Sequence, residues 1–220
     1  MNPFKYWLEL LTLLLCFTTC MAKEVDREAK FWEWFKANKT RFYEQTEPQE
    51  NLFDEFSVQL YKVDSSLAFE FSPVHSDGIR ELTISADGIR EYFPIVKSLV
   101  AKAPKLDKWK INAFRQRLPD DYNSIEYGSK IKLSYEDVYF RYAKDSGKIA
   151  IELNVRNLID SPSFKHTIYI LLDGLLGEYD METQISTIEF VLLDEKKIPN
   201  LLSLIDLRSI VDKNKQSSIK

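Results

Sequence analysis

The sequence predicts an α+β fold: an antiparallel-rich sheet with helices packed mainly on one face, preceded by two N-terminal helices. Apolar residues recur at helical spacing over 26–45 and 48–63. From Leu67 onward they alternate with a period of two, which is typical of half-buried strands. Turns that contain Gly78 and Gly147 join neighbouring strands, so we expect hairpins and not a doubly wound nucleotide-binding fold.

The first predicted helix, 26–45, carries an aromatic stripe. Phe31, Phe35 and Phe42 share one face, and two tryptophans flank it. The opposite face mixes both signs of charge and is not uniformly basic. This pattern favours docking on the sheet over a membrane interface or a partner surface, so we expect these three phenylalanines in the core.

The other elements follow from the same periodicities and from turn signals. We predict helices over 48–63, 88–103, 163–177 and 201–211, strands over 66–72, 82–86, 108–117, 125–127, 130–133, 138–143, 149–157 and 185–193, and one helical turn after Ser134. The order β-β-α-β thus occurs twice, over 66–117 and 138–193. The two halves share no matching residues, so the sequence leaves a pseudo-repeat as one possibility.

The first 22 residues resemble a signal peptide. Lys5 precedes an apolar run over 10–17, and Ala22 ends the segment with a small side chain. The run is well short of the ~20 residues of a membrane-spanning helix. We therefore expect export, with cleavage after Ala22, to the periplasm or the medium.

A lipoprotein signal is the alternative, in which Cys20 becomes acylated and anchors the protein in the cell envelope. The preceding residues, Phe17 to Thr19, match the expected lipoprotein pattern poorly. Both cysteines of the chain, Cys16 and Cys20, lie in the leader, so cleavage after Ala22 would exclude disulfides and cysteine-ligated zinc.

Composition and charge narrow the class of protein. The chain has 45% hydrophobic and 13% aromatic residues and a net charge of −4, which removal of the leader does not change. Nucleic-acid-binding domains are usually basic, so we expect no such partner. No linker interrupts 23–212, which we predict to be a single α+β domain followed by a polar flexible tail over 213–220.

Two groups of charged residues are candidate ligand-binding sites. Four acidic residues lie close together where a predicted helix ends and a predicted strand begins: Asp173, Glu178, Asp180 and Glu182. We expect Asp180 and Glu182 to share one face of that strand. Converging carboxylates bind hard cations or divide acid and base roles, although a solvated acidic turn is the commoner outcome.

Arg115 and Arg117 form the second group, at alternate positions of the strand predicted over 108–117. Two guanidinium groups on one strand face could clamp a carboxylate or a phosphate. The alternative is that these arginines pair with acidic neighbours.

No catalytic motif, metal-ligand spacing or glycine-rich phosphate loop occurs, so the sequence predicts no cofactor, no metal and no catalytic residue. It favours an exported, non-enzymatic domain that binds an unknown protein or a small ligand. The alternative is a hydrolase or metal-dependent enzyme that uses the acidic segment from Asp173 to Glu182.

Three stretches resemble a family of uncharacterised bacterial proteins: F-W-x-W-F at 31–35, I-S-A-D-G-I at 84–89 and L-L-D-x-x-L-G-E-Y-D-x-E-T at 171–183. The likeness spans 31–212. It implies a bacterial source and a single domain, and it brings no reaction, ligand or catalytic residue with it. Family members begin near the aromatic helix, so the leader of this chain is a departure from the family pattern.

Overall fold

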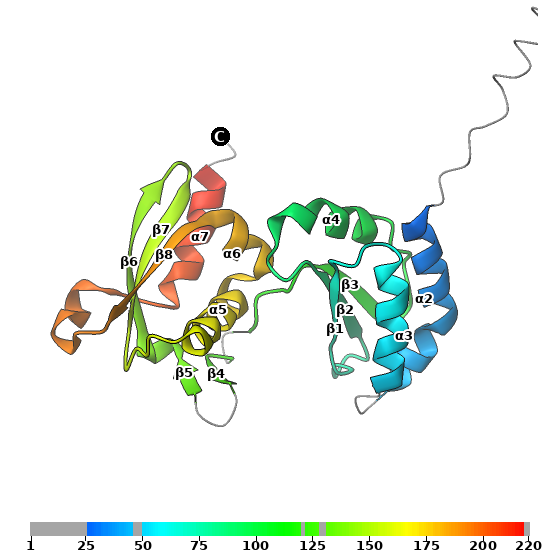
Figure 1. Ribbon diagram of the computed structural model, residues 1–220, viewed down its shortest axis with the longest axis horizontal. Coiled ribbons are helices and arrows are strands. Elements are labelled where there is room, and N and C mark those ends of the chain that lie inside the picture. The colour runs from blue at the N-terminus through cyan, green and yellow to red at the C-terminus, as the bar shows by residue number, and fades with distance from the viewer. Residues whose placement is uncertain (1–25, 46–49, 120–121, 128–130, 218–220) are drawn as a thin grey trace, which may run out of the picture.

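The structure, a computed structural model, describes residues 26–45, 50–119, 122–127 and 131–217 (Figure 1). The predicted signal peptide over 1–22, with Cys20, lies outside the described residues. The described chain forms two lobes, each with its own sheet and its own hydrophobic core. We call residues 26–119 the N-lobe and residues 122–217 the C-lobe.

The N-lobe has two helices followed by a three-stranded sheet in the order β1-β2-β3. Its elements are α2 (Arg27–Glu44), α3 (Glu50–Tyr61), β1 (Ala68–Phe71), β2 (Arg80–Ser85), the short 3-10 helix η1 (Arg90–Tyr92), α4 (Phe93–Ala101) and β3 (Trp109–Ala113). Strand β1 pairs with β2 in the antiparallel sense, and β2 pairs with β3 in the parallel sense. The two predicted N-terminal helices are thereby confirmed.

Aromatic side chains fill the core of the N-lobe. Phe35, Phe42 and Phe56 are fully buried, and their rings meet at 5.5–5.8 Å between centroids. Phe71 of β1 stacks on Phe42 at 5.3 Å and so joins the helices to the sheet. Phe31 is buried as well, which confirms that the aromatic face of α2 docks inside the protein.

The C-lobe begins with a separate hairpin and continues into a four-stranded sheet in the order β8-β7-β6-β9. Its elements are β4 (Ser124–Tyr127), β5 (Ile131–Ser134), η2 (Tyr135–Asp137), β6 (Val138–Asp145), β7 (Lys148–Val155), α5 (Pro162–Leu176), α6 (Glu178–Gln184), β8 (Ile185–Leu192), η3 (Glu195–Asn200), β9 (Leu202–Ser203) and α7 (Asp206–Ser217). The turn predicted after Ser134 is present as η2, with a capping box between Ser134 and Asp137.

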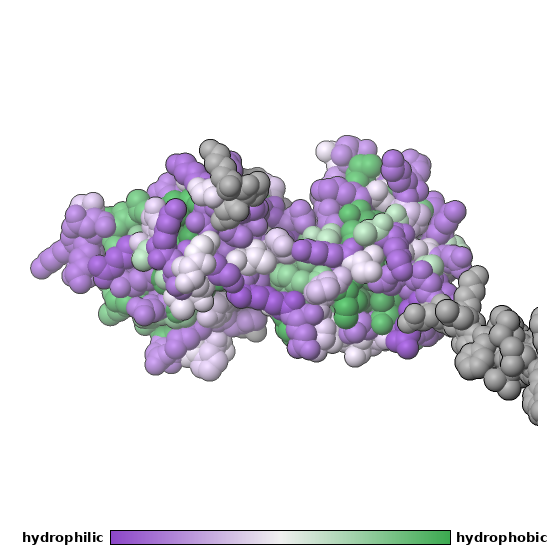
Figure 2. Space-filling view, turned by 90° about the horizontal axis from the view of Figure 1, so that it is seen from above, coloured by the Kyte–Doolittle hydropathy of each residue, from purple (hydrophilic) through white to green (hydrophobic). Residues whose placement is uncertain are grey.

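Helices α5, α6 and α7 contribute to the C-lobe core together with the inward side chains of β6, β7 and β8. The other face of this sheet is polar: Arg141 of β6 binds Glu152 of β7, and Glu189 of β8 lies directly opposite Glu152. The space-filling view shows hydrophilic side chains over most of both lobes, with smaller apolar patches on each (Figure 2). The chain has the predicted α+β fold with mostly antiparallel sheets, although the N-lobe sheet contains one antiparallel and one parallel strand pair.

The two lobes share one β-β-α-β topology. In the N-lobe β1, β2, α4 and β3 follow one another, and in the C-lobe the matching elements are β6, β7, α5 and β8. In each lobe the middle strand pairs with the first in the antiparallel sense and with the last in the parallel sense. The pseudo-repeat that the sequence left open is therefore present in the topology.

The C-terminal end differs from the prediction. The helix predicted over 201–211 is α7, which begins at Asp206 and continues to Ser217. Residues 213–217 are thus helical and not part of a flexible tail. Buried Asn214 donates to the carbonyl of Gly147 at 2.9 Å, and this contact ties the last turns to the sheet. Among the described residues, none of the helices combines the length and the apolar character needed to span a membrane.

Candidate functional site

The six charged candidates from the sequence meet where the two lobes join. Arg115 and Arg117 lie in the connector that follows β3, and the four acidic residues lie at the end of α5 and in α6 (Figure 1). The prediction that both arginines share one face of a strand is wrong, because β3 ends at Ala113. Phe114 has a φ of 68°, and its ring packs 4.5 Å from that of Phe93, so the chain leaves the sheet there.

The acidic segment is helical and not extended. Glu178, Asp180 and Glu182 belong to α6, so the prediction that Asp180 and Glu182 share a strand face is wrong. Two of these carboxylates lie in the first turn of the helix, where the helix dipole favours negative charge. Gly177 ends α5 as predicted, with φ 79° and ψ 147°, a region that essentially only glycine adopts.

Glu178 is fully buried, and its carboxylate accepts hydrogen bonds from the backbone of the other lobe. One oxygen accepts from the backbone N–H groups of Ala86 and Gly88, each at 3.1 Å. The other oxygen accepts from the N–H of Arg115 at 3.0 Å, and the N–H of Glu178 donates to the carbonyl of Arg115. These hydrogen bonds replace those that the buried carboxylate would make to water. The Glu178 side chain therefore joins the two lobes.

Asp180 is also buried and is paired with two cations. It lies 2.7 Å from Arg117 and 2.8 Å from Lys215. Arg117 also binds Asp212 at 2.7 Å, and its Nε donates to the carbonyl of Leu176 at 2.9 Å. The hydrogen bond to Asp212 is the main cause that raises the pKa of Arg117. This network fastens the connector to α5, α6 and α7.

The side chains of Arg115 and Glu182 are also paired near the junction, Arg115 within the N-lobe and Glu182 across to it. Burial alone would lower the pKa of Arg115, but hydrogen bonds to Glu70 and Asp87 outweigh burial and raise that pKa. Glu182 binds Arg90 of the N-lobe at 3.0 Å. The predicted alternative, in which these arginines pair with acidic side chains, therefore describes both Arg115 and Arg117.

Asp173 is the exception among the four acidic candidates. Its half-buried carboxylate has no hydrogen bond to any described residue. Burial is the main cause that raises its pKa to about 6, the charge of Arg115 opposes this shift, and Glu178, Glu182 and Asp87 add to it. In the described part of the chain, no three acidic or histidine side chains are placed to hold a metal ion.

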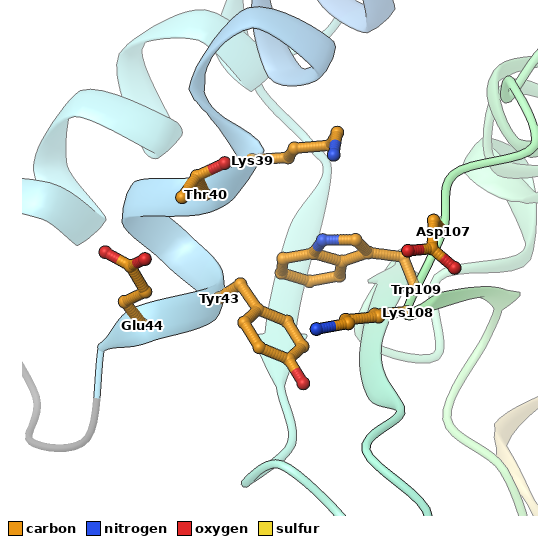
Figure 3. A pocket seen from close by; sticks show the side chains of 7 residues that line it. All are labelled: Lys39, Thr40, Tyr43, Glu44, Asp107, Lys108 and Trp109. Atoms are coloured by element: carbon orange, nitrogen blue, oxygen red, sulfur yellow. The ribbon is translucent and has the colours of Figure 1, made fainter.

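A pocket of about 270 Å³ lies in the N-lobe, away from this junction, between the C-terminal half of α2 and the start of β3 (Figure 3). Its lining residues are Lys39, Thr40, Tyr43, Glu44, Asp107, Lys108 and Trp109. We call it the Lys39–Trp109 pocket. In Figure 3 the side chains of Lys39 and Lys108 lie on opposite sides of the Trp109 indole, and Tyr43 faces the indole from α2.

Packing fixes the aromatic walls of the pocket. Trp109 is buried, with its ring 5.1 Å from that of Phe35 and 6.2 Å from that of Tyr43. The hydroxyl of Tyr43 donates to the carbonyl of Gly78 at 2.8 Å. Buried Arg80 of β2 donates to the carbonyls of Phe42 and Gln45 and so holds the C-terminal end of α2 against the sheet.

Sequence reasoning missed this pocket. It placed residues 39–44 in the helix predicted over 26–45 and Trp109 in the strand predicted over 108–117, and it assigned neither segment to a site. The available signal was the pair Lys39 and Tyr43, which are four positions apart and therefore adjacent on one face of the helix. Nothing in the sequence brings that pair to Trp109, which is contributed by β3.

Comparisons of the chain with protein-family models, with curated proteins and with solved structures gave no match.

Proposed function

We propose that this chain is an exported bacterial protein that binds a small ligand in the Lys39–Trp109 pocket and does not alter it chemically. The observation that carries the proposal is the pocket itself, which has two packed aromatic walls and pendant charged side chains. Small-molecule sites typically combine aromatic walls with a few polar groups in this way. Export rests on the leader over 1–22, with acylation of Cys20 as the lipid-anchored variant, and the bacterial source rests on the family resemblance.

The lobe junction supports binding over the alternative of a hydrolase or metal-dependent enzyme. Acid and base catalysis by the acidic segment needs at least two carboxylates that face one space. Glu178 binds backbone N–H groups, and Asp180 and Glu182 bind cations of the connector, of α7 and of the N-lobe. Asp173 is left without a second carboxylate to share a reaction, so these residues are better understood as the connection between the lobes.

Closing the pocket tests the proposal. Thr40 is exposed on α2 beside the pocket, so Thr40→Trp should fill the pocket without entering the core. Compounds found in a thermal-shift screen of the purified chain should bind at least tenfold more weakly to this variant by calorimetry. Lys36→Trp is the matched control, because Lys36 is exposed one turn earlier on the same helix and does not line the pocket.

The proposal is wrong if no compound in the screen binds, or if the compounds that bind do so equally well to Thr40→Trp. It is also wrong if mass spectrometry finds that a bound compound has been converted to a product.

A further inference from the structure

The Lys39–Trp109 pocket presents hydrogen-bond donors that bind nothing within the described residues. Half-buried Lys39 has no hydrogen-bond or ion-pair partner there, and neither does the indole Nε1–H of Trp109. The Lys108 ammonium makes only a cation–π contact, 5.4 Å from the centre of the Tyr43 ring. Lysine and tryptophan side chains donate and never accept, so within the described residues these three groups are left to water or to a ligand that brings an acceptor.

The backbone at Lys108 supports a role for its side chain. Its φ of 63° lies in the left-handed region, which costs a residue other than glycine or asparagine about 1–2 kcal/mol. This conformation lets the carbonyl of Lys108 accept from the N–H of Arg80 at 2.9 Å. The side chain is thereby held over Tyr43 and along the pocket wall, close to the indole (Figure 3).

Charges are arranged unequally between the inside and the edge of the pocket. Glu44, Asp107 and Lys108 are exposed, whereas Lys39 is half-buried and Trp109 is buried. The interior therefore offers the Lys39 ammonium and the Trp109 N–H, whereas the edge carries both signs of charge. With a volume of about 270 Å³, the pocket is smaller than the ~300–1,000 Å³ usual for drug-sized ligands, so a ligand that fills it is small.

We infer that the pocket selects a small organic carboxylate, an inference that rests on the ligand-binding function proposed above. The carboxylate accepts from the Lys39 ammonium and the Trp109 Nε1–H in charge-assisted hydrogen bonds, and the Lys108 ammonium adds positive charge from the other side of the indole. The organic part lies against the Tyr43 ring. Its polar groups, where present, donate to Glu44 and Asp107.

Matched pairs of probes test the inference by calorimetry on the purified chain. Each carboxylate is compared with a neutral twin: glucuronate with glucose, lactate with propane-1,2-diol, and benzoate with benzyl alcohol. Inorganic phosphate is included to separate an organic carboxylate from a bare oxyanion. We expect at least one carboxylate to bind ten times more tightly than both its twin and phosphate, and to weaken as salt concentration rises.

Two substitutions place that binding in the pocket. Lys39→Met removes the charge but keeps an apolar stem, so it should weaken carboxylate binding at least fivefold, and Lys108→Met, which removes the more distant charge, should weaken it less. Lys36→Met, on the exposed face of α2 outside the pocket, should leave it unchanged. Circular-dichroism melts of the three variants check that each remains folded.

The inference is overturned if no carboxylate binds better than its twin, if phosphate binds as tightly as the best carboxylate, or if Lys39→Met binds like the parent chain. If a neutral twin binds as tightly as its carboxylate and Thr40→Trp abolishes that binding, the carboxylate inference is wrong and the proposed ligand-binding function stands. Failure of every screened compound to bind contradicts that function itself.

Discussion

A buried carboxylate persists only where hydrogen bonds replace its water, and Glu178 meets this condition with backbone N–H groups from the other lobe. Asp173, five residues earlier, lacks such donors within the described chain. The two carboxylates therefore differ in what burial does to them. Glu178 contributes to the contact between the lobes, whereas the charge on Asp173 opposes folding.

The pKa of Asp173, raised from 3.8 to about 6, predicts the direction of its effect on stability. The folded chain binds the proton of the Asp173 carboxyl more tightly than the unfolded chain does. The contribution of this proton to the free energy of unfolding is therefore fully present below about pH 4 and is lost as the pH rises through 6. Asp173→Asn removes the titration. We expect the free energy of unfolding of this variant to equal that of the parent chain at pH 4. At pH 7 it should be higher by about 1–2 kcal/mol, after allowance for solvent screening.

Urea melts of both chains between pH 4 and pH 7 measure this difference, and titrations common to the two chains cancel in it. A difference that stays constant with pH would mean that Asp173 is ionised as easily in the folded chain as in the unfolded one.

At the scale of elements, the junction depends on a sharp break between two helices. A Cβ at Gly177 would lie 3.2 Å from the carbonyl oxygen of Arg115 and 3.3 Å from the N–H nitrogen of Arg117. Glycine is therefore required at position 177 for two reasons: the backbone angle, and the close approach of the break between α5 and α6 to the connector. Gly147, in the turn between β6 and β7, has a similar φ of 83° but nothing within 4 Å of a Cβ.

These two glycines make a matched pair. Gly147→Ala carries the cost of a positive φ, about 1 kcal/mol, whereas Gly177→Ala combines a backbone region that essentially only glycine adopts with steric conflict against the connector and should cost about 3 kcal/mol or more. Chemical denaturation of both variants measures the difference. Equal losses would show that the connector yields freely to a larger side chain, and the tight approach would then be unimportant.

The elements also show what local pattern could and could not predict. The helical spacing of Phe31, Phe35 and Phe42 predicted α2 correctly, because the spacing of apolar residues reflects which side chains are buried. The segment 178–184 is short and polar, so the spacing of its apolar residues could not distinguish a helix from a strand. The end of β3 at Ala113 depends on the packing of Phe114 against α4 and Tyr179, and no local residue signals this contact.

At the scale of the whole molecule, the sequence brought the six charged candidates together only in part. It placed the acidic residues near one another because they are neighbours in the chain. It could not assign Glu178 to Ala86 and Gly88, because backbone donors carry no residue identity and lie about 90 positions away. The Lys39–Trp109 pocket was missed for the same reason, since its walls are distant segments.

The junction predicts that the two lobes unfold together, as the predicted single domain over 23–212 requires. The described tryptophans Trp32, Trp34 and Trp109 all lie in the N-lobe, so their fluorescence reports on that lobe, whereas far-UV circular dichroism reports on both. We expect the two melts to coincide. Leu172→Ala, in the C-lobe core, should cost about 2–5 kcal/mol and lower the melting temperature seen by tryptophan fluorescence as well.

Two separated transitions, with the fluorescence melt unmoved by Leu172→Ala, would contradict this prediction and divide the chain into two independent domains. Thr187→Ala, at an exposed position of β8 in the same lobe, is the control and should move neither melt.

Each lobe is continuous in sequence, and this has a consequence for the nascent chain. A ribosome adds ~5–20 residues per second, so Glu178, 59 positions after the N-lobe ends at residue 119, arrives roughly 3–12 s after that lobe is complete in sequence. During that interval the N-lobe is already complete in sequence, but the backbone N–H groups of Ala86, Gly88 and Arg115 still lack the carboxylate that they bind in the finished protein. Until Glu178 is made, these three N–H groups are left to water.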